Sequence, residues 1–177
     1  MRSGMRERRL NKGEYMNDIN LKRCWQQVWE KAKEVKEGRI LFYGSSTFTL
    51  WKTMEEDMLP YLVVNNGFGG STAEEALYYY YLLVRPFKPS AIVYYEGDND
   101  LAEGYEPEEI LTRVAQFFKW AKADFPGIPL YIVLVKHCPA RDALREKRQR
   151  LNDLLTDFAS KNAIEGIDLN KVVLDEK

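Results

Sequence analysis

The 177-residue sequence has little cysteine, almost no net charge and no long apolar run. Its two cysteines, Cys24 and Cys138, are too few for a disulfide scaffold in a chain that can bury a proper core, which favours a reducing, cytoplasmic location. The 26 lysines and arginines nearly cancel the 27 aspartates and glutamates, so no overall field attracts nucleic acid or anionic lipid. No apolar run approaches the roughly 20 residues of a membrane-spanning helix. We therefore expect neither a nucleic-acid partner nor a membrane partner.

The first 20 residues are basic and polar and lack the apolar core of a signal peptide. Because chain termini are commonly held loosely, we interpret residues 1–20 as a flexible leader. Residues 21–177 have the length of one ordinary domain with a sizeable core. The expected organisation is thus a leader followed by a single domain.

Five apolar runs rich in β-branched and aromatic residues alternate with segments of helical periodicity. The runs span residues 39–43, 61–65, 91–95, 129–135 and, more weakly, 163–169. Most are apolar without interruption, which is typical of parallel strands covered on both faces. Right-handed crossovers then predict a three-layer α/β/α sandwich. We expect the flavodoxin-like strand order 2-1-3-4-5.

Four segments have the pattern of amphipathic helices: residues 21–38, 71–84, 106–127 and 141–162. The second opens with Ser71 and has Glu74 three residues later, the spacing of a capping box. The apolar faces predicted for the first and last helices consist of Trp25, Val28, Trp29 and Ala32, and of Leu144, Leu151, Leu154, Leu155 and Phe158.

Small and polar residues follow each of the first four predicted strands, as GSST, NNGFGGST, EGDND and KHCPAR. Ligands of open α/β sheets bind beyond the carboxyl ends of the strands, beside the point where strand order reverses. A serine hydroxyl there can attack a carbonyl if a base takes its proton, while N–H groups stabilise the oxyanion. Ser45 or Ser46 could supply the hydroxyl, Asn99 an amide and the glycine-rich loop a backbone N–H.

These blocks together resemble the SGNH or GDSL-type hydrolases, serine esterases and acyl hydrolases on a flavodoxin-like fold, in the branch with GSS in place of GDS. The resemblance implies that Ser46 is the nucleophile, that Gly70 of NNGFGGST contributes an oxyanion N–H, and that Asn99 of GDND contributes the oxyanion amide. It also implies a small-molecule ester substrate and neither a cofactor nor a metal. Three blocks in the family's order are much more specific than any one of them.

The family's last block, D-x-x-H, supplies the base and has no match in this sequence. We therefore expect a domain truncated at its C-terminus and a turnover lowered by several orders of magnitude. The only histidine, His137, follows the fourth strand, where the resemblance places a loop on the substrate side that also contains Arg141. Without a final helix, part of the sheet face near the last strand should be bare, which predicts a homo-oligomer.

Alternative interpretations stay open. Ser46 could be a helix cap, and Asn99 could stabilise an Asx turn. Glu96, Asp98 and Asp100 carry the oxygen ligands that a divalent metal prefers, but no second acidic cluster accompanies them.

The fold would also suit a non-catalytic module that binds flavin phosphate, a carbohydrate or an acyl group. A flavodoxin phosphate loop, however, needs glycine where Phe48 stands.

Overall fold

A computed structural model describes residues 22–173, so the expected leader lies outside the described residues. Five parallel strands form one sheet in the order β2-β1-β3-β4-β5, which confirms the expected fold. The strands are β1 (Ile40–Gly44), β2 (Val63–Asn65), β3 (Ala91–Tyr95), β4 (Leu130–Val133) and β5 (Glu165–Ile167). Strand order reverses between β1 and β3, where Gly44 pairs with Tyr95 at the carboxyl ends of both strands.

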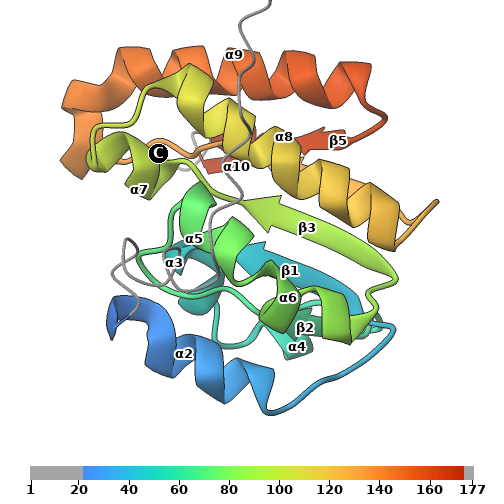
Figure 1. The fold of residues 1–177 in the computed structure, drawn as a ribbon. Helices are drawn as coiled ribbons and strands as arrows, with labels where there is room; N and C mark the ends of the chain where they lie inside the picture. The colour runs from blue at the N-terminus through green and yellow to red at the C-terminus, as the bar shows by residue number, and fades with distance from the viewer. Residues whose placement is uncertain (1–21, 174–177) are drawn as a thin grey trace, which may run out of the picture.

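Helices cover both faces of the sheet, although unequally (Figure 1). The thicker layer consists of α2 (Lys22–Ala32), α5 (Ala73–Tyr78), α6 (Tyr80–Leu83), α8 (Pro107–Asp124) and α9 (Arg145–Lys161). The thinner layer consists of α3 (Ser46–Thr49), α4 (Met54–Asp57) and α10 (Asn170–Val173). The short helix α7 (Asp98–Ala102) lies beyond the end of β3, and two 3₁₀ turns, η1 (Arg85–Phe87) and η2 (Pro139–Leu144), precede β3 and α9.

The larger core, beneath the thick layer, is built largely from aromatic rings. Tyr94 of β3 stacks on Phe117 of α8 with 4.2 Å between ring centroids, and Tyr43 of β1 stacks on the same ring at 5.7 Å. The Tyr43 hydroxyl is buried but donates a hydrogen bond to the Ala76 carbonyl oxygen at 2.7 Å. Rings of this size contribute both buried area and favourable edge and stacking contacts. The sheet is thereby fixed to α5 and α8.

The helix predicted over residues 71–84 starts one residue later than expected and is interrupted. Thr72, not Ser71, is the N-cap, and its capping box is completed by Glu75. The Ser71 hydroxyl instead donates to Glu96 at 2.6 Å, a long-range contact that local spacing could not reveal. The helix breaks at Tyr79, which separates α5 from α6.

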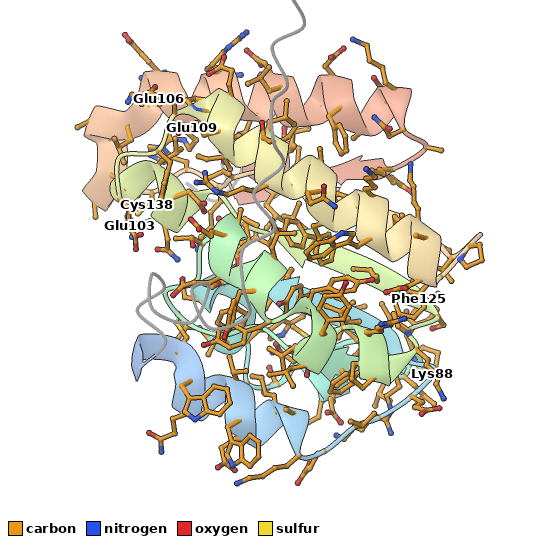
Figure 2. The ribbon with its side chains drawn as sticks, viewed as in Figure 1. Lys88, Glu103, Glu106, Glu109, Phe125 and Cys138 are labelled. Atoms are coloured by element: carbon orange, nitrogen blue, oxygen red, sulfur yellow. The ribbon has the colours of Figure 1, made fainter. Side chains whose placement is uncertain are left out.

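Helix α8 has a capping box of its own, in which the Glu106 backbone N–H donates to the Glu109 carboxylate at 2.9 Å (Figure 2). Carboxylates in the first turn also interact favourably with the positive end of the helix dipole. The start of α8 is therefore fixed by local sequence, and it agrees with the helix predicted over residues 106–127.

The predicted apolar face of α2 is rotated in the structure. Cys24 and Val28 are fully buried, whereas Trp25 and Trp29 are 44% and 47% exposed. The two indole rings stack on each other with 5.7 Å between centroids. In α9, Leu151 and Leu155 are buried as expected, but Leu154 is only half-buried.

Exposed apolar side chains lie on α2, on α6 and beside β2, and not, as expected, on the sheet face near β5. Near β5, Tyr131, Ile167 and Leu169 are half-buried and pack against the smaller core. The exposed residues around β2 and the thin layer are Leu50, Leu59, Tyr61 and Leu62. Self-association stays a prediction, which light scattering can test. Among the described residues, the helices are too short or too polar to cross a bilayer.

Candidate active site

At the turn after β1, the backbone of Gly44 lies in close contact with the end of β3. Gly44 has φ 139°, and a Cβ added to it would lie 1.9 Å from the Tyr95 carbonyl oxygen. The Ser45 backbone N–H donates to the same oxygen at 3.1 Å. Helix α3 begins at once with Ser46. The end of β1 therefore delivers the two serines directly to the point where strand order reverses.

The two serines occupy different environments. Ser45 is the N-cap of α3, its side chain makes no capping hydrogen bond, and it is only 2% exposed. Ser46 is the first helical residue and is half-buried. The helix-cap interpretation of Ser46 is thus wrong, since the cap position belongs to Ser45. Of the pair, Ser46 is the residue more accessible to a substrate.

The loop after β2 is bonded to the turn after β1. The Phe68 N–H donates to the Gly44 carbonyl oxygen at 2.8 Å, and the Asn65 side chain donates to the Phe48 carbonyl oxygen at 2.7 Å. Gly70 lies later in this loop with φ 80°, a conformation that glycine adopts without strain. The candidate oxyanion glycine therefore belongs to a loop that is fixed to the serine turn.

The loop after β3 is in turn bonded to the loop after β2. The Asn99 Nδ2 group donates to the Ser71 carbonyl oxygen at 2.9 Å. Asp100 accepts from the Ala73 backbone N–H at 3.0 and 3.2 Å, and Glu96 accepts from the Ser71 hydroxyl. Because a side-chain amide has two N–H groups, the bond to Ser71 leaves one for a ligand.

These bonds join the loops that carry Ser46, Gly70 and Asn99 into one unit at the carboxyl edge of the sheet. Figure 1 shows the same assembly, with α3, α5 and α7 at the ends toward which the β1 and β3 arrows point. The three sequence-predicted residues therefore lie on loops that hydrogen bonds hold together.

Arg141 fixes the orientation of the Asn99 side chain. Its guanidinium contacts the Asp98 carboxylate at 2.7 Å and the Asp98 carbonyl oxygen at 2.8 Å, and donates to Asn99 Oδ1 at 3.1 Å. Since Oδ1 accepts from Arg141, the Nδ2 group turns toward Ser71. The sequence suggested a substrate contact for Arg141, whereas the structure shows it bound to the Asp98–Asn99 loop.

Two carboxyl groups beneath the loops are buried. Burial raises the pKa of Glu96 well above its ordinary value, and the neighbouring Asp100 acts in the same direction. Burial also raises the pKa of Asp100, to about 7, against the opposing hydrogen bond from the Ala73 N–H. In both groups burial therefore favours the protonated, uncharged form.

His137 is exposed, and the ring nitrogen Nδ1, which could accept a proton, is engaged by Arg148. The Arg148 guanidinium lies 3.0 Å from His137 Nδ1. A guanidinium has only donors, so Nδ1 must be the acceptor and the proton of the neutral ring is on Nε2. Neither nitrogen then has a free lone pair. Figure 2 shows the next residue, Cys138, at the edge where the loop after β4 packs on α7.

The acidic residues of this region do not form a metal centre. Glu96, Asp98 and Asp100 bind three different partners, Ser71, Arg141 and the Ala73 N–H. Between residues 22 and 173, no three histidine, cysteine or acidic side chains are grouped so that they could hold a metal ion.

A flavin-phosphate loop at the turn after β1 is likewise unsupported. The Phe48 side chain is buried there, with its ring 5.3 Å from that of Phe42 and 6.0 Å from that of Tyr95. The loop is therefore filled by packed aromatic rings.

Solved structures share this fold. A GDSL-like lipase from Bacteroides thetaiotaomicron is 22% identical, with a TM-score of 0.70 over 84% of this chain and 78% of that chain. A candidate acylhydrolase from Bacteroides fragilis is 20% identical, with a TM-score of 0.70 over 83% and 77%. A candidate platelet activating factor protein from Streptococcus pneumonia is 18% identical, with a TM-score of 0.77 over 93% and 83%.

A comparison with curated proteins found no match. The sequence profile of the GDSL-like Lipase/Acylhydrolase family, however, matches residues 43–177, which begin at the end of β1 and include all three candidate loops. The chain therefore belongs to the GDSL-like lipase/acylhydrolase family.

Proposed function

We propose that this chain is an ester hydrolase that uses Ser46 as its nucleophile. The observation that carries the proposal is that hydrogen bonds join the three loops after β1, β2 and β3. Its key bonds are Phe68 N–H to the Gly44 oxygen at 2.8 Å and Asn99 Nδ2 to the Ser71 oxygen at 2.9 Å. Membership of a lipase/acylhydrolase family supports a small-molecule ester as the substrate class.

In the proposed reaction, Ser46 Oγ attacks the ester carbonyl, and its proton passes to solvent water. The negative charge that develops on the carbonyl oxygen is stabilised by the free N–H of Asn99, with the backbone N–H groups of Ser46 and Gly70. Each donor of this kind contributes on the order of 10²–10³ in rate. Collapse of the intermediate expels the alcohol and leaves an acyl group on Ser46, which water then removes as the acid.

Both proton transfers need a base, and His137 is the only histidine of the sequence. Its Nδ1 accepts from Arg148, so we expect it to contribute little to either step. Formation and hydrolysis of the acyl-enzyme should then both be slow. Steady-state turnover is a poor test of Ser46 in such a case, because members of a catalytic group act together and removing one costs about as much as removing all.

The direct test is acyl transfer to the protein. After incubation with p-nitrophenyl acetate, we expect one acetyl group per chain, located on the peptide that contains Ser46 and detected by mass spectrometry. Ser46→Ala should lose the adduct. Ser45→Ala is the matched control: it removes the neighbouring hydroxyl, which makes no capping bond, and should keep both fold and adduct. Acetylation that persists unchanged in Ser46→Ala would remove Ser46 from the mechanism.

Asn99→Ala tests the oxyanion role separately. We expect it to lower the rate constant of acetylation by about 10²–10³, because a preorganised donor is lost from the transition state. Circular dichroism should show a folded protein, since the deleted contacts to Ser71 and Arg141 lie at the edge of the sheet. An unchanged acetylation rate in a folded Asn99→Ala protein would exclude this amide from the oxyanion site.

A non-catalytic acyl-binding module is the second candidate, favoured by the engagement of His137 with Arg148. It predicts saturable binding of a short-chain ester without any covalent adduct. The acetylation experiment distinguishes the two functions directly.

A further inference from the structure

A cavity of about 520 Å³ lies between α9 and the segment that follows β5. Its walls include His137, Arg145, Arg148, Asn152, Asp168 and Asn170. None of the proposed catalytic residues, Ser46, Gly70 and Asn99, lines it. The walls of the cavity thus come from α9, the loop after β4 and the segment after β5.

Arg148 is the unusual residue of this cavity, because it is a charged side chain that is only 8% exposed. Between residues 22 and 173, no carboxylate lies within 4.0 Å of its guanidinium, and the hydrogen bond to His137 Nδ1 is the one contact of its donors that the structure shows. Burying a cation without an anionic partner is costly. Arg145 lies three residues earlier, on the same face of α9, and also lines the cavity.

The other polar walls are fixed by bonds within the protein. The Asn152 side chain accepts from the Val135 N–H at 2.8 Å and donates to the Val135 oxygen at 2.9 Å. Asn170 accepts from the His137 backbone N–H at 2.6 Å and donates to Asp168 at 2.9 Å. The two amides are thus engaged within the protein, whereas neither arginine has an ion pair with residues 22–173.

The cavity also contains negative charge. Asp168 and Asp153 both line it, and each has one oxygen engaged, Asp168 with Asn170 and Asp153 with Gln149. Two carboxylates beside two arginines disfavour a doubly charged anion such as phosphate. They favour a ligand that offers a single negative charge to the arginines and a hydrogen-bond donor to an aspartate.

We propose that this cavity binds a small carboxylic acid that also carries a hydroxyl or ammonium group. The ligand carboxylate pairs with Arg148 and Arg145 in the forked geometry that guanidinium and carboxylate share. The hydroxyl or ammonium group donates to Asp168 or Asp153. Binding supplies an anionic partner for Arg148, which has none among residues 22–173.

The single histidine gives a specific probe, because His137 is the only source of imidazole signals and is bonded directly to Arg148. At constant pH, glycolate and glycine should each shift the His137 ring resonances saturably in NMR spectra, with dissociation constants on the order of millimolar. Acetate, which lacks the second group, should bind more weakly, and phosphate more weakly still. The ratio of the dissociation constants of glycolate and glycine shows whether a hydroxy acid or an amino acid is the better ligand.

Arg148→Met should weaken binding by about tenfold or more, since it removes a charge-assisted hydrogen bond and keeps the apolar stem. Arg145→Gln, an exposed position, gives the same test at lower risk to folding and should also weaken binding. Ser46→Ala should bind as the unmodified chain does, which separates this site from the proposed esterase. No saturable shift, strongest binding by phosphate, or binding unchanged in a folded Arg145→Gln protein would each overturn the proposal.

Discussion

Gly44→Ala is expected to lower the free energy of unfolding by more than about 4 kcal/mol, enough to prevent stable folding of an ordinary domain. The new Cβ would lie 1.9 Å from the Tyr95 carbonyl oxygen, and φ is 139°, where a side chain is strained in any case. Relief would require β1 to move away from β3, which breaks the pairing at the centre of the sheet. Urea unfolding followed by circular dichroism measures the effect.

Gly104→Ala is the matched control for this substitution. Gly104 also has positive φ, 93°, but a Cβ there would meet nothing within 4 Å. It should therefore cost only about 1–2 kcal/mol, the backbone penalty alone. If both variants lower the free energy of unfolding equally, β1 and β3 can separate to accommodate a Cβ at Gly44, which contradicts this account.

Asp100→Asn is expected to stabilise the protein increasingly as the pH rises. Burial raises the pKa of Asp100 from 3.8 to about 7 in the folded state, so folding favours the protonated form. The stability that this group contributes is present below about pH 4 and is lost as the pH rises through 7. Over that window the loss is at most about 4 kcal/mol for a shift of this size. Asparagine stays neutral and still accepts from the Ala73 N–H.

The measurement is the free energy of unfolding of the variant and the unmodified chain between pH 4 and pH 8. Their difference should grow with pH in favour of Asp100→Asn. A constant difference across this range would mean that Asp100 is ionised throughout in the folded protein.

The sheet could be predicted from sequence because its strands are continuous apolar runs. The AIVYY run coincides with β3, all of whose residues are buried. The buried face of a helix was harder to predict, since apolar residues can recur with the same period on a buried face and on an exposed one. Trp25 and Trp29 satisfy the helical pattern of α2, yet the core contact belongs to Cys24 and Val28. Only the packing of α2 on its neighbours decides this.

The candidate site could be located from its motifs but not assembled from them. Strand order placed GSST, the glycine-rich loop and GDND at one edge. The bonds that orient them depend on residues distant in sequence, such as Arg141, which reaches Asn99 from the loop after β4. The buried Arg148 had no signal in the sequence, because REKRQR has the composition of a solvated helix face.

A crystal structure of the chain treated with a fluorophosphonate tests the central claim most directly. We predict a phosphonyl group bonded to Ser46 Oγ, with its free oxygen accepting hydrogen bonds from Asn99 Nδ2 and from the backbone N–H groups of Ser46 and Gly70. A phosphonyl group attached elsewhere, or one on Ser46 whose oxygen turns away from Asn99, would contradict the account.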